Sequence, residues 1–180
     1  VVRWITNLIA DYKKDLNERN IQPLSDDYIK FIRLGQHYIE KNGTGILAFI
    51  TNNTFIDGII HRQMRFDLAE TFDDIYIVDL HGNAKKNELG HDGDKDENVF
   101  DIMQGVSVSL FVKTGKKKKG GLARVFHHEL LGSRQRKYEN LDSMNWGNLL
   151  WNEIKMEKPY YFYVPKDFSL RSEYEKGFTT

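Results

Sequence analysis

Phe100 is the residue of this sequence whose type and surroundings most clearly suggest chemistry. It stands in a polar loop, just before a strand-like segment, 106–112, whose first half alternates valines with small hydroxyl side chains. A bulky ring in such a place is either a plug that fills the core or an exposed face on which a flat molecule stacks. The residues alone favour the plug and leave the stacking surface open.

A lysine run, Lys116, Lys117, Lys118 and Lys119, is the second such feature. The net charge of the chain is zero, but residues 113–137 hold nine Lys and Arg and one acid, whereas residues 88–101 hold six acids and one Lys. A basic segment of this kind can bind the phosphates of a nucleic acid. The alternative is a solvated hairpin tip, which the same composition predicts equally well.

Other motifs are excluded by their spacing. The loop from His91 to Asp96 is acidic, but the positions that need Gly and Glu in a calcium-binding loop hold Glu97 and Met103. His127 and His128 are adjacent on an expected strand and point to opposite faces, so they cannot easily share a metal. The chain has no Cys, no G-x-S-x-G motif and no glycine-rich phosphate-binding motif. We therefore predict no metal site and no hydrolase nucleophile.

Composition bounds the class of protein. A chain of 180 residues with 40% hydrophobic residues can bury a core as one domain, or as one domain with an appendage. It contains no apolar stretch long enough to span a membrane and begins without a recognisable signal peptide, so we expect a cytoplasmic protein.

The pattern of apolar residues predicts the elements that position these features. Helical spacing predicts helices over 2–18, from Ser25 or Asp26 to 42, and over 55–70. Apolar runs predict strands over 46–50, 75–80, 106–112 and 122–126, the first buried on both faces and the last two paired as a hairpin. The sequence thus predicts an α/β fold that resembles the second half of a doubly wound sheet and ends in an antiparallel ribbon. We divide the chain into 1–131 and an irregular C-terminal arm, 132–180.

Four segments in order, 26–33, 45–58, 75–83 and 99–113, resemble the later motifs of adenine-specific (N6) DNA methyltransferases, above all the large fused restriction–modification enzymes of types IIG and ISP. Residues 158–168 resemble the stretch that links this domain to a target-recognition region. The family's catalytic Asn-Pro-Pro-Tyr motif and its glycine-containing donor loop are absent here. Because both lie upstream in the family, the resemblance implies a fragment that begins just after the catalytic motif.

This resemblance implies the carboxyl half of a Rossmann-like methyltransferase sheet, ending in an antiparallel β-hairpin. The parent enzyme would transfer a methyl group from S-adenosylmethionine to adenine N6 in double-stranded DNA. A nuclease and a target-recognition domain could be fused outside this chain. The fragment itself would contain no catalytic residue, would be inactive alone and would bind S-adenosylmethionine weakly or not at all.

The resemblance also assigns roles to residues. Phe100 resembles the aromatic that holds the flipped adenine, and Phe31 resembles an aromatic that lines the methyl-donor pocket, although a core role for Phe31 stays open. Thr51, Asn52 and Asn53 lie where open α/β sheets bind ligands, but helix capping explains them as well. The alternative function is a non-catalytic α/β module that binds DNA or a partner subunit. A methyltransferase for RNA or protein is a third, weaker hypothesis.

Overall fold

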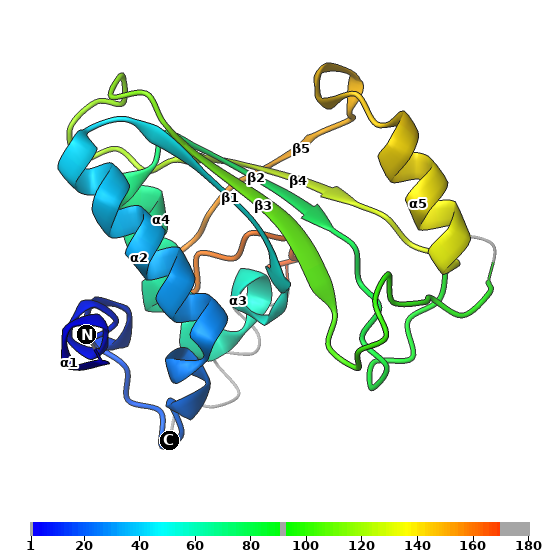
Figure 1. Ribbon diagram of the computed structural model, residues 1–180, viewed down its shortest axis with the longest axis horizontal. Coiled ribbons are helices and arrows are strands. Elements are labelled where there is room, and N and C mark those ends of the chain that lie inside the picture. Colours follow the sequence, from blue (N-terminus) through cyan, green and yellow to red (C-terminus); the bar gives the residue numbers. More distant parts are fainter. Residues whose placement is uncertain (1, 91–92, 170–180) are drawn as a thin grey trace.

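The computed structural model describes residues 2–90 and 93–169, so His91, Asp92 and the end of the predicted arm lie outside the described residues. Its centre is a five-stranded sheet in the order β1-β3-β2-β4-β5 (Figure 1). The strands are β1 (Gly45–Asn52), β2 (Asp74–Asp79), β3 (Val106–Lys113), β4 (Arg124–Glu129) and β5 (Asn152–Ile154).

The directions of these strands place three carboxyl ends at one edge of the sheet. β3 is antiparallel to both β1 and β2, β4 is parallel to β2, and β5 is antiparallel to β4. β1, β2 and β4 therefore point the same way. This mixed sheet with helices confirms the predicted fold class, an α/β sheet of the Rossmann-like kind that becomes antiparallel.

The predicted hairpin between segments 106–112 and 122–126 is wrong, because β2 lies between β3 and β4. The connection from β3 crosses the end of β2, where Asp73 anchors it. The Asp73 carboxylate accepts a hydrogen bond from the Thr114 amide at 2.7 Å, and the Asp73 carbonyl accepts one from the Arg124 amide at 3.0 Å. Instead, β3 pairs antiparallel with β2, to which the long 80–105 loop joins it, and β4 pairs antiparallel with β5.

The helices are α1 (Val2–Leu8), α2 (Asp27–Asn42), α3 (Thr54–Asp57), α4 (Arg62–Thr71) and α5 (Arg134–Ser143). Two predicted helices are shorter than expected. The helix over 2–18 ends at Leu8 and gives way to a 3₁₀ turn, Asp11–Lys13, before Asp15 takes a left-handed φ of 54°. The helix over 55–70 breaks at Gly58, which is extended with ψ 133°.

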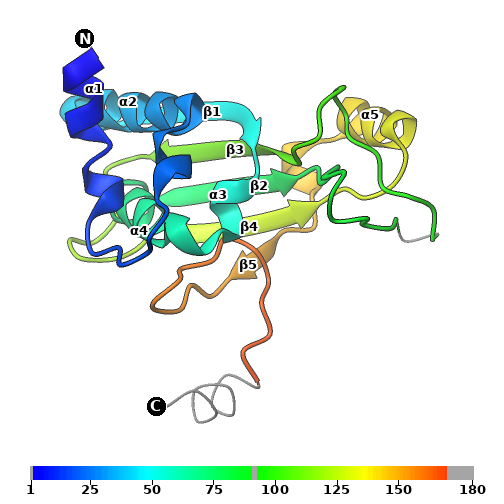
Figure 2. The same cartoon turned by 90° about the horizontal axis from the view of Figure 1, so that it is seen from below.

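One face of the sheet carries the main core. α1, α2 and α4 lie on this side, near one end, and α5 stands at the other end (Figure 2). Buried apolar side chains from the helices meet those of the strands, among them Ile32, Leu68, Phe72, Ile75 and Phe111.

The opposite face is covered only in part. Tyr76 and Phe126 stack there at 4.9 Å between ring centroids, and Trp146 and Trp151 pack edge-on against Tyr76. On β1 the alternate residues Ile46 and Ile50 are 66% and 55% exposed. The expected burial of β1 on both faces is therefore wrong, because β1 is the edge strand of the described sheet.

The described part of the predicted arm, 132–169, is not irregular throughout, since it contains α5 and β5. Tyr163 is fully buried and its hydroxyl donates to the Arg65 carbonyl at 2.5 Å. The buried Arg65 guanidinium donates to the carbonyls of Tyr160 and Tyr161. Residues 160–163 are thus tied to α4. In the described ranges, the helices are all too short or too polar to cross a membrane.

Candidate functional site at the carboxyl ends of the strands

The carboxyl ends of β1 and β2 are tied to each other and to the 80–105 loop. Asn53, just after β1, donates through Nδ2 to Asp79 Oδ1 at 2.8 Å. The same Asp79 oxygen accepts the His81 amide at 3.0 Å, and the Asn53 amide donates to the Gly105 carbonyl at 3.0 Å. This edge of the sheet is the place where open α/β folds bind ligands, and here its backbone is fixed by buried polar groups.

Phe100 lies at this edge and is not a core plug, since 44% of the residue is exposed. Its amide donates to Asn98 Oδ1 at 2.9 Å, and its carbonyl accepts from Arg134 Nη2 at 3.1 Å. Asn98 Nδ2 also donates to the carbonyls of Gly82 and Gln104, at 2.9 and 2.7 Å. The buried Asn98 side chain therefore connects three backbone positions of the loop that carries the exposed Phe100 ring.

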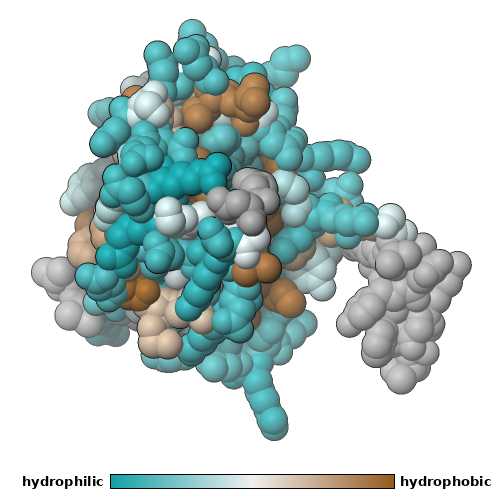
Figure 3. All heavy atoms as spheres, turned by 90° about the vertical axis from the view of Figure 1, so that its right-hand side faces the viewer, coloured by the Kyte–Doolittle hydropathy of each residue, from teal (hydrophilic) through white to brown (hydrophobic). Residues whose placement is uncertain are grey.

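The tip of this loop is apolar. Ile102 and Met103 follow Phe100 and are 49% and 59% exposed. The side of the molecule that carries α5 and this loop is otherwise largely hydrophilic, with separate small hydrophobic patches (Figure 3). Exposed large apolar side chains that gather on one loop mark a binding surface more often than a stability element.

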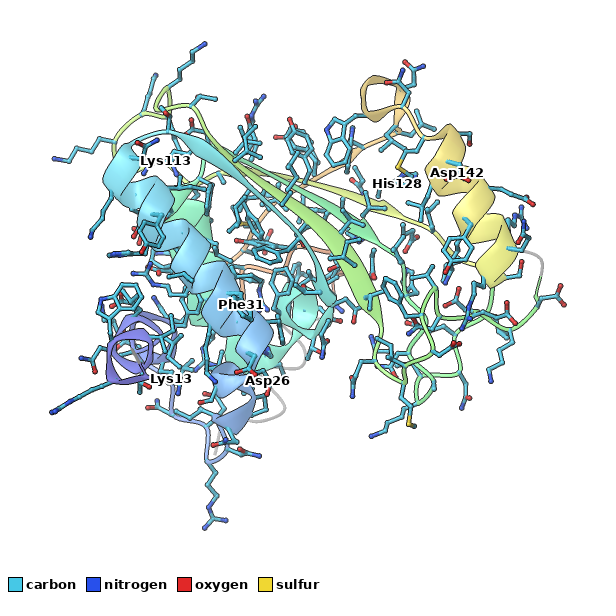
Figure 4. The ribbon with its side chains drawn as sticks, viewed as in Figure 1. Lys13, Asp26, Phe31, Lys113, His128 and Asp142 are labelled. Carbon is cyan, nitrogen blue, oxygen red and sulfur yellow. The ribbon has the colours of Figure 1, made fainter. Side chains whose placement is uncertain are left out.

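Phe31 is also exposed, at 57%, so its core role is excluded. It lines a pocket of about 330 Å³ between α1 and α2, together with Trp4, Ile5, Leu34 and an ion pair of Lys30 with Asp27. Because α2 runs antiparallel to β1, the amino end of α2 and the carboxyl end of β1 lie toward the same side of the molecule (Figure 4). Phe31 is in the amino-terminal half of α2 and Phe100 is in the 80–105 loop, so the two rings come from different elements.

The lysine run lies at the opposite end of the sheet, in the connection from β3 to β4 (Figure 2). Lys116, Lys118 and Lys119 are exposed there. Lys117 is different, because its ammonium donates to the carbonyls of Ala69, Glu70 and Phe72 at 2.6–2.7 Å. It occupies the end of α4, and burial lowers its pKa. DNA binding remains a prediction for all four lysines, but Lys117 already has carbonyl partners at the end of α4.

The remaining polar candidates have structural partners. Asn52 Oδ1 accepts the Thr54 amide at 2.8 Å, so the capping interpretation holds for Asn52. His127 is 3% exposed and burial lowers its pKa, while His128 Nδ1 lies 3.2 Å from the Leu150 carbonyl oxygen. Across 2–90 and 93–169, no group of three or more His, Asp and Glu side chains is arranged to hold a metal ion.

The feature that sequence reasoning missed is α5. Its Lys137 ammonium lies 2.7 Å from Asp96 Oδ1 and donates to the carbonyls of Leu80 and Glu97. Asp96 in turn accepts the amides of Gly82 and Gly132. The only signal in the sequence is the opposite charge of the acidic segment 88–101, which contains Asp96, and the basic segment 113–137, which contains Lys137. Asp96 and Lys137 join these two segments through their ion pair.

No known family model matches the chain, and no curated protein sequence matches it. Solved structures do. A cryo-EM structure of a DrdV–DNA complex has a TM-score of 0.74 and 25% identity over 88% of this chain. The ATP-dependent Type ISP restriction–modification enzyme LlaBIII bound to DNA has a TM-score of 0.78 and 25% identity over 96% of it.

A nuclease-deletion mutant of the Type ISP restriction–modification enzyme LlaGI, in complex with a DNA substrate mimic, has a TM-score of 0.76 and 21% identity over 94% of this chain. The match covers 15%, 12% and 16% of the DrdV, LlaBIII and LlaGI chains, respectively. The chain thus has the fold of a segment of DrdV and of two Type ISP restriction–modification enzymes, and it spans about a seventh of the length of these chains.

Proposed function

We propose that this chain is part of a cytoplasmic DNA adenine-N6 methyltransferase within a restriction–modification enzyme, with S-adenosylmethionine as methyl donor and double-stranded DNA as substrate. One observation carries the proposal. The ring of Phe100 is exposed at the carboxyl edge of the sheet, while its amide and its carbonyl are both held by hydrogen bonds.

The chemistry of adenine methylation needs such a ring. An exocyclic amine inside a duplex is out of reach of a methyl donor, so the target base has to leave the stack. An aromatic face replaces part of the lost stacking, which is worth about 1–3 kcal/mol per base. A ring on a fixed backbone provides this face at a smaller entropic cost than a ring on a mobile loop. The DNA in the three similar structures supports this choice of substrate.

We further propose that the pocket beside Phe31 binds part of the donor. In this proposal Phe31 and Trp4 offer aromatic surface for the adenine moiety of S-adenosylmethionine, and the Lys30–Asp27 ion pair adds charged groups to the lining. When bound, S-adenosylmethionine supplies the methyl group. The residues of this pocket would contribute only one side of a donor site, so the proposal assigns the catalytic amide and the glycine-containing donor loop to other parts of the protein.

The experiment that tests this function measures N6-methyladenine by mass spectrometry. The full-length protein is expressed in a host without adenine methyltransferases, and the DNA of that host is digested to nucleosides. We expect N6-methyladenine with the native protein and strongly reduced amounts with Phe100→Ala. Absence of N6-methyladenine with a well-folded native protein would refute the proposal.

A non-catalytic module that binds DNA or a partner subunit is the second candidate. Two observations on β1 favour it: Ile46 and Ile50 are exposed on one face of the strand, and β3 is the only described strand that pairs with β1. Such an edge suits an added protein surface. This candidate predicts that the full-length protein binds DNA or another subunit and leaves adenine unmodified.

A further inference from the structure

Three consecutive carbonyl groups of the Phe100 loop are held by two side chains of α5. Arg134 Nε donates to the Asn98 carbonyl at 2.7 Å, and Arg134 Nη2 donates to the Phe100 carbonyl at 3.1 Å. The Val99 carbonyl between them accepts from the Tyr138 hydroxyl at 2.5 Å. The planar guanidinium thus spans two alternate carbonyls, and the phenol takes the one in the middle.

Two further interactions complete the hold on Phe100. Arg134 Nη2 forms an ion pair with Asp101 Oδ1 at 2.7 Å, just after the ring. The Phe100 amide donates to Asn98 Oδ1 at 2.9 Å. With the backbone fixed on both sides, the orientation of the ring depends only on its own side-chain torsions, which have few staggered states.

The helix that provides these interactions is itself anchored elsewhere. The Lys137–Asp96 ion pair is 1% and 0% exposed and fastens α5 to the loop stems. Arg134 and Tyr138 lie nearer the surface, at 38% side-chain exposure and 42% residue exposure. Replacing them removes the hold on the carbonyls and leaves the anchor of the helix in place, because Lys137 and Asp96 are unchanged.

We infer that Arg134 and Tyr138 are positioning residues that aim the ring of Phe100 at the flipped base. They touch the loop backbone and would act on the base only through Phe100. This inference rests on the proposed function, and it brings α5, which the sequence assigned to the linking arm, into the base-binding site.

The test uses the full-length protein with Arg134→Ala combined with Tyr138→Phe. The matched control is Gln135→Ala, which changes the same helix at a side chain that bonds to Glu139 within α5. Hydrogen exchange followed by mass spectrometry reports the peptide 98–104, and a single-turnover assay with saturating S-adenosylmethionine reports methylation of duplex DNA. Thermal melting is recorded for every variant.

We expect faster exchange in peptide 98–104 and a fall of about tenfold in the methylation rate, as for the loss of hydrogen bonds from a charged donor. The apparent KM for S-adenosylmethionine should stay unchanged, because Phe31 lies on another element. Arg134→Lys, which keeps the charge facing Asp101 but cannot span two carbonyls with a planar fork, should show a smaller fall. Gln135→Ala should behave like the native protein.

The outcomes separate this inference from the function on which it rests. Unchanged exchange in peptide 98–104, or faster exchange with full methylation, overturns the positioning role. A loss of activity in Phe100→Ala with none in the double variant overturns the positioning role alone. If neither variant loses methylation, the stacking role of Phe100 fails as well.

Discussion

Lys137 Nζ and Asp96 Oδ1 form an ion pair of 2.7 Å with both side chains almost fully buried. The two Asp96 oxygens also accept the amides of Gly82 and Gly132, and the ammonium donates to the Leu80 and Glu97 carbonyls. The pair is therefore hydrogen-bonded on both sides, which is the condition under which buried charges are tolerated. It joins α5, the end of β2 and the stem of the Phe100 loop.

Lys137→Met should lower the free energy of unfolding by about 3–5 kcal/mol, because it leaves the Asp96 carboxylate buried without its counter-ion. Urea denaturation at neutral pH measures this loss. Lys155→Met is the matched control, since Lys155 is 89% exposed and faces Glu157 at 3.4 Å, so that this change should cost about 0–1 kcal/mol. The double variant Asp96→Asn with Lys137→Met should lose less than Lys137→Met alone, and an equal or greater loss would contradict this account.

Local patterns predict much of the fold. The strands are recognisable because apolar runs such as 46–50 and 75–80 are short and bounded by turn residues, and α2 is recognisable because its apolar spacing and its end at Asn42-Gly43 agree. Strand order cannot be predicted in the same way. The short connection between β3 and β4 suggests that these strands form a hairpin. In the structure this connection passes the end of β2, where Asp73 binds it through hydrogen bonds, and β4 pairs on the far side of β2.

The candidate site shows the same limit. The exposure of Phe100 does not follow from its type, since an aromatic in a loop fills a core as readily as it faces solvent. The role of Lys117 is hidden because four consecutive lysines look alike in a sequence, and only Lys117 donates to the carbonyls at the end of α4. Ion pairs such as Asp96 with Lys137 join residues far apart in the chain, so a local pattern of residue types cannot predict them.

The three exposed lysines of the run should contribute salt-dependent affinity for DNA. Replacing Lys116, Lys118 and Lys119 with Ser should reduce the slope of log affinity against log salt by about 0.9 for each phosphate that these side chains neutralise in the native protein. Fluorescence anisotropy with a labelled duplex at several salt concentrations measures this slope. An unchanged slope would show that the run is only a solvated turn.

Lys117→Ala should leave that slope unchanged and lower stability, because Lys117 binds three carbonyls at the end of α4. A cation at this end of a helix contributes about 0.3–1 kcal/mol, and more when it is partly buried. Thermal melting of the same set of variants separates the two effects. A loss of DNA affinity in Lys117→Ala without a loss of stability would place Lys117 among the DNA-binding lysines after all.

His61 should make the protein sensitive to acid. It is 1% exposed, neither ring nitrogen has a hydrogen-bond partner within the described part of the chain, and burial lowers its pKa to about 4. In the unfolded chain the pKa of His61 is near 6.5. Between pH 6.5 and pH 4 the unfolded chain therefore binds a proton on His61 that the folded protein does not bind. The free energy of unfolding is thus unaffected by His61 above pH 6.5 and decreases as the pH falls toward 4. At pH 5 the loss from His61 alone is about 2 kcal/mol relative to pH 7.

His61→Leu replaces the titrating imidazole with an apolar side chain of similar volume. Urea denaturation at pH 7 and pH 5 should show a smaller loss of stability on acidification in the variant than in the native protein, by about 2 kcal/mol. The comparison cancels the contribution of the carboxylates, which titrate in both proteins. An equal loss in the two proteins would mean that His61 is already hydrated or paired in the folded state.

Phe100→Ala in the full-length protein should reduce DNA methylation about tenfold to a hundredfold, which corresponds to about 1.4–2.7 kcal/mol at the transition state. Stability should change little, because a ring that is 44% exposed buries only part of its surface. A buried plug would instead cost about 3–5 kcal/mol of stability on truncation. Thermal melting and methylation therefore have to be measured on the same variants.

Phe100→Trp completes this test. Stacking needs an aromatic face more than one particular ring, so the tryptophan variant should retain much of the activity. The hydrogen bonds with Asn98 and Arg134 involve only main-chain atoms of residue 100 and remain available. Affinity for S-adenosylmethionine should stay close to native in both variants, since Phe31 is on α2. Full methylation by Phe100→Ala, or a melting temperature far below native, would show that the ring does not act as a stacking face for adenine.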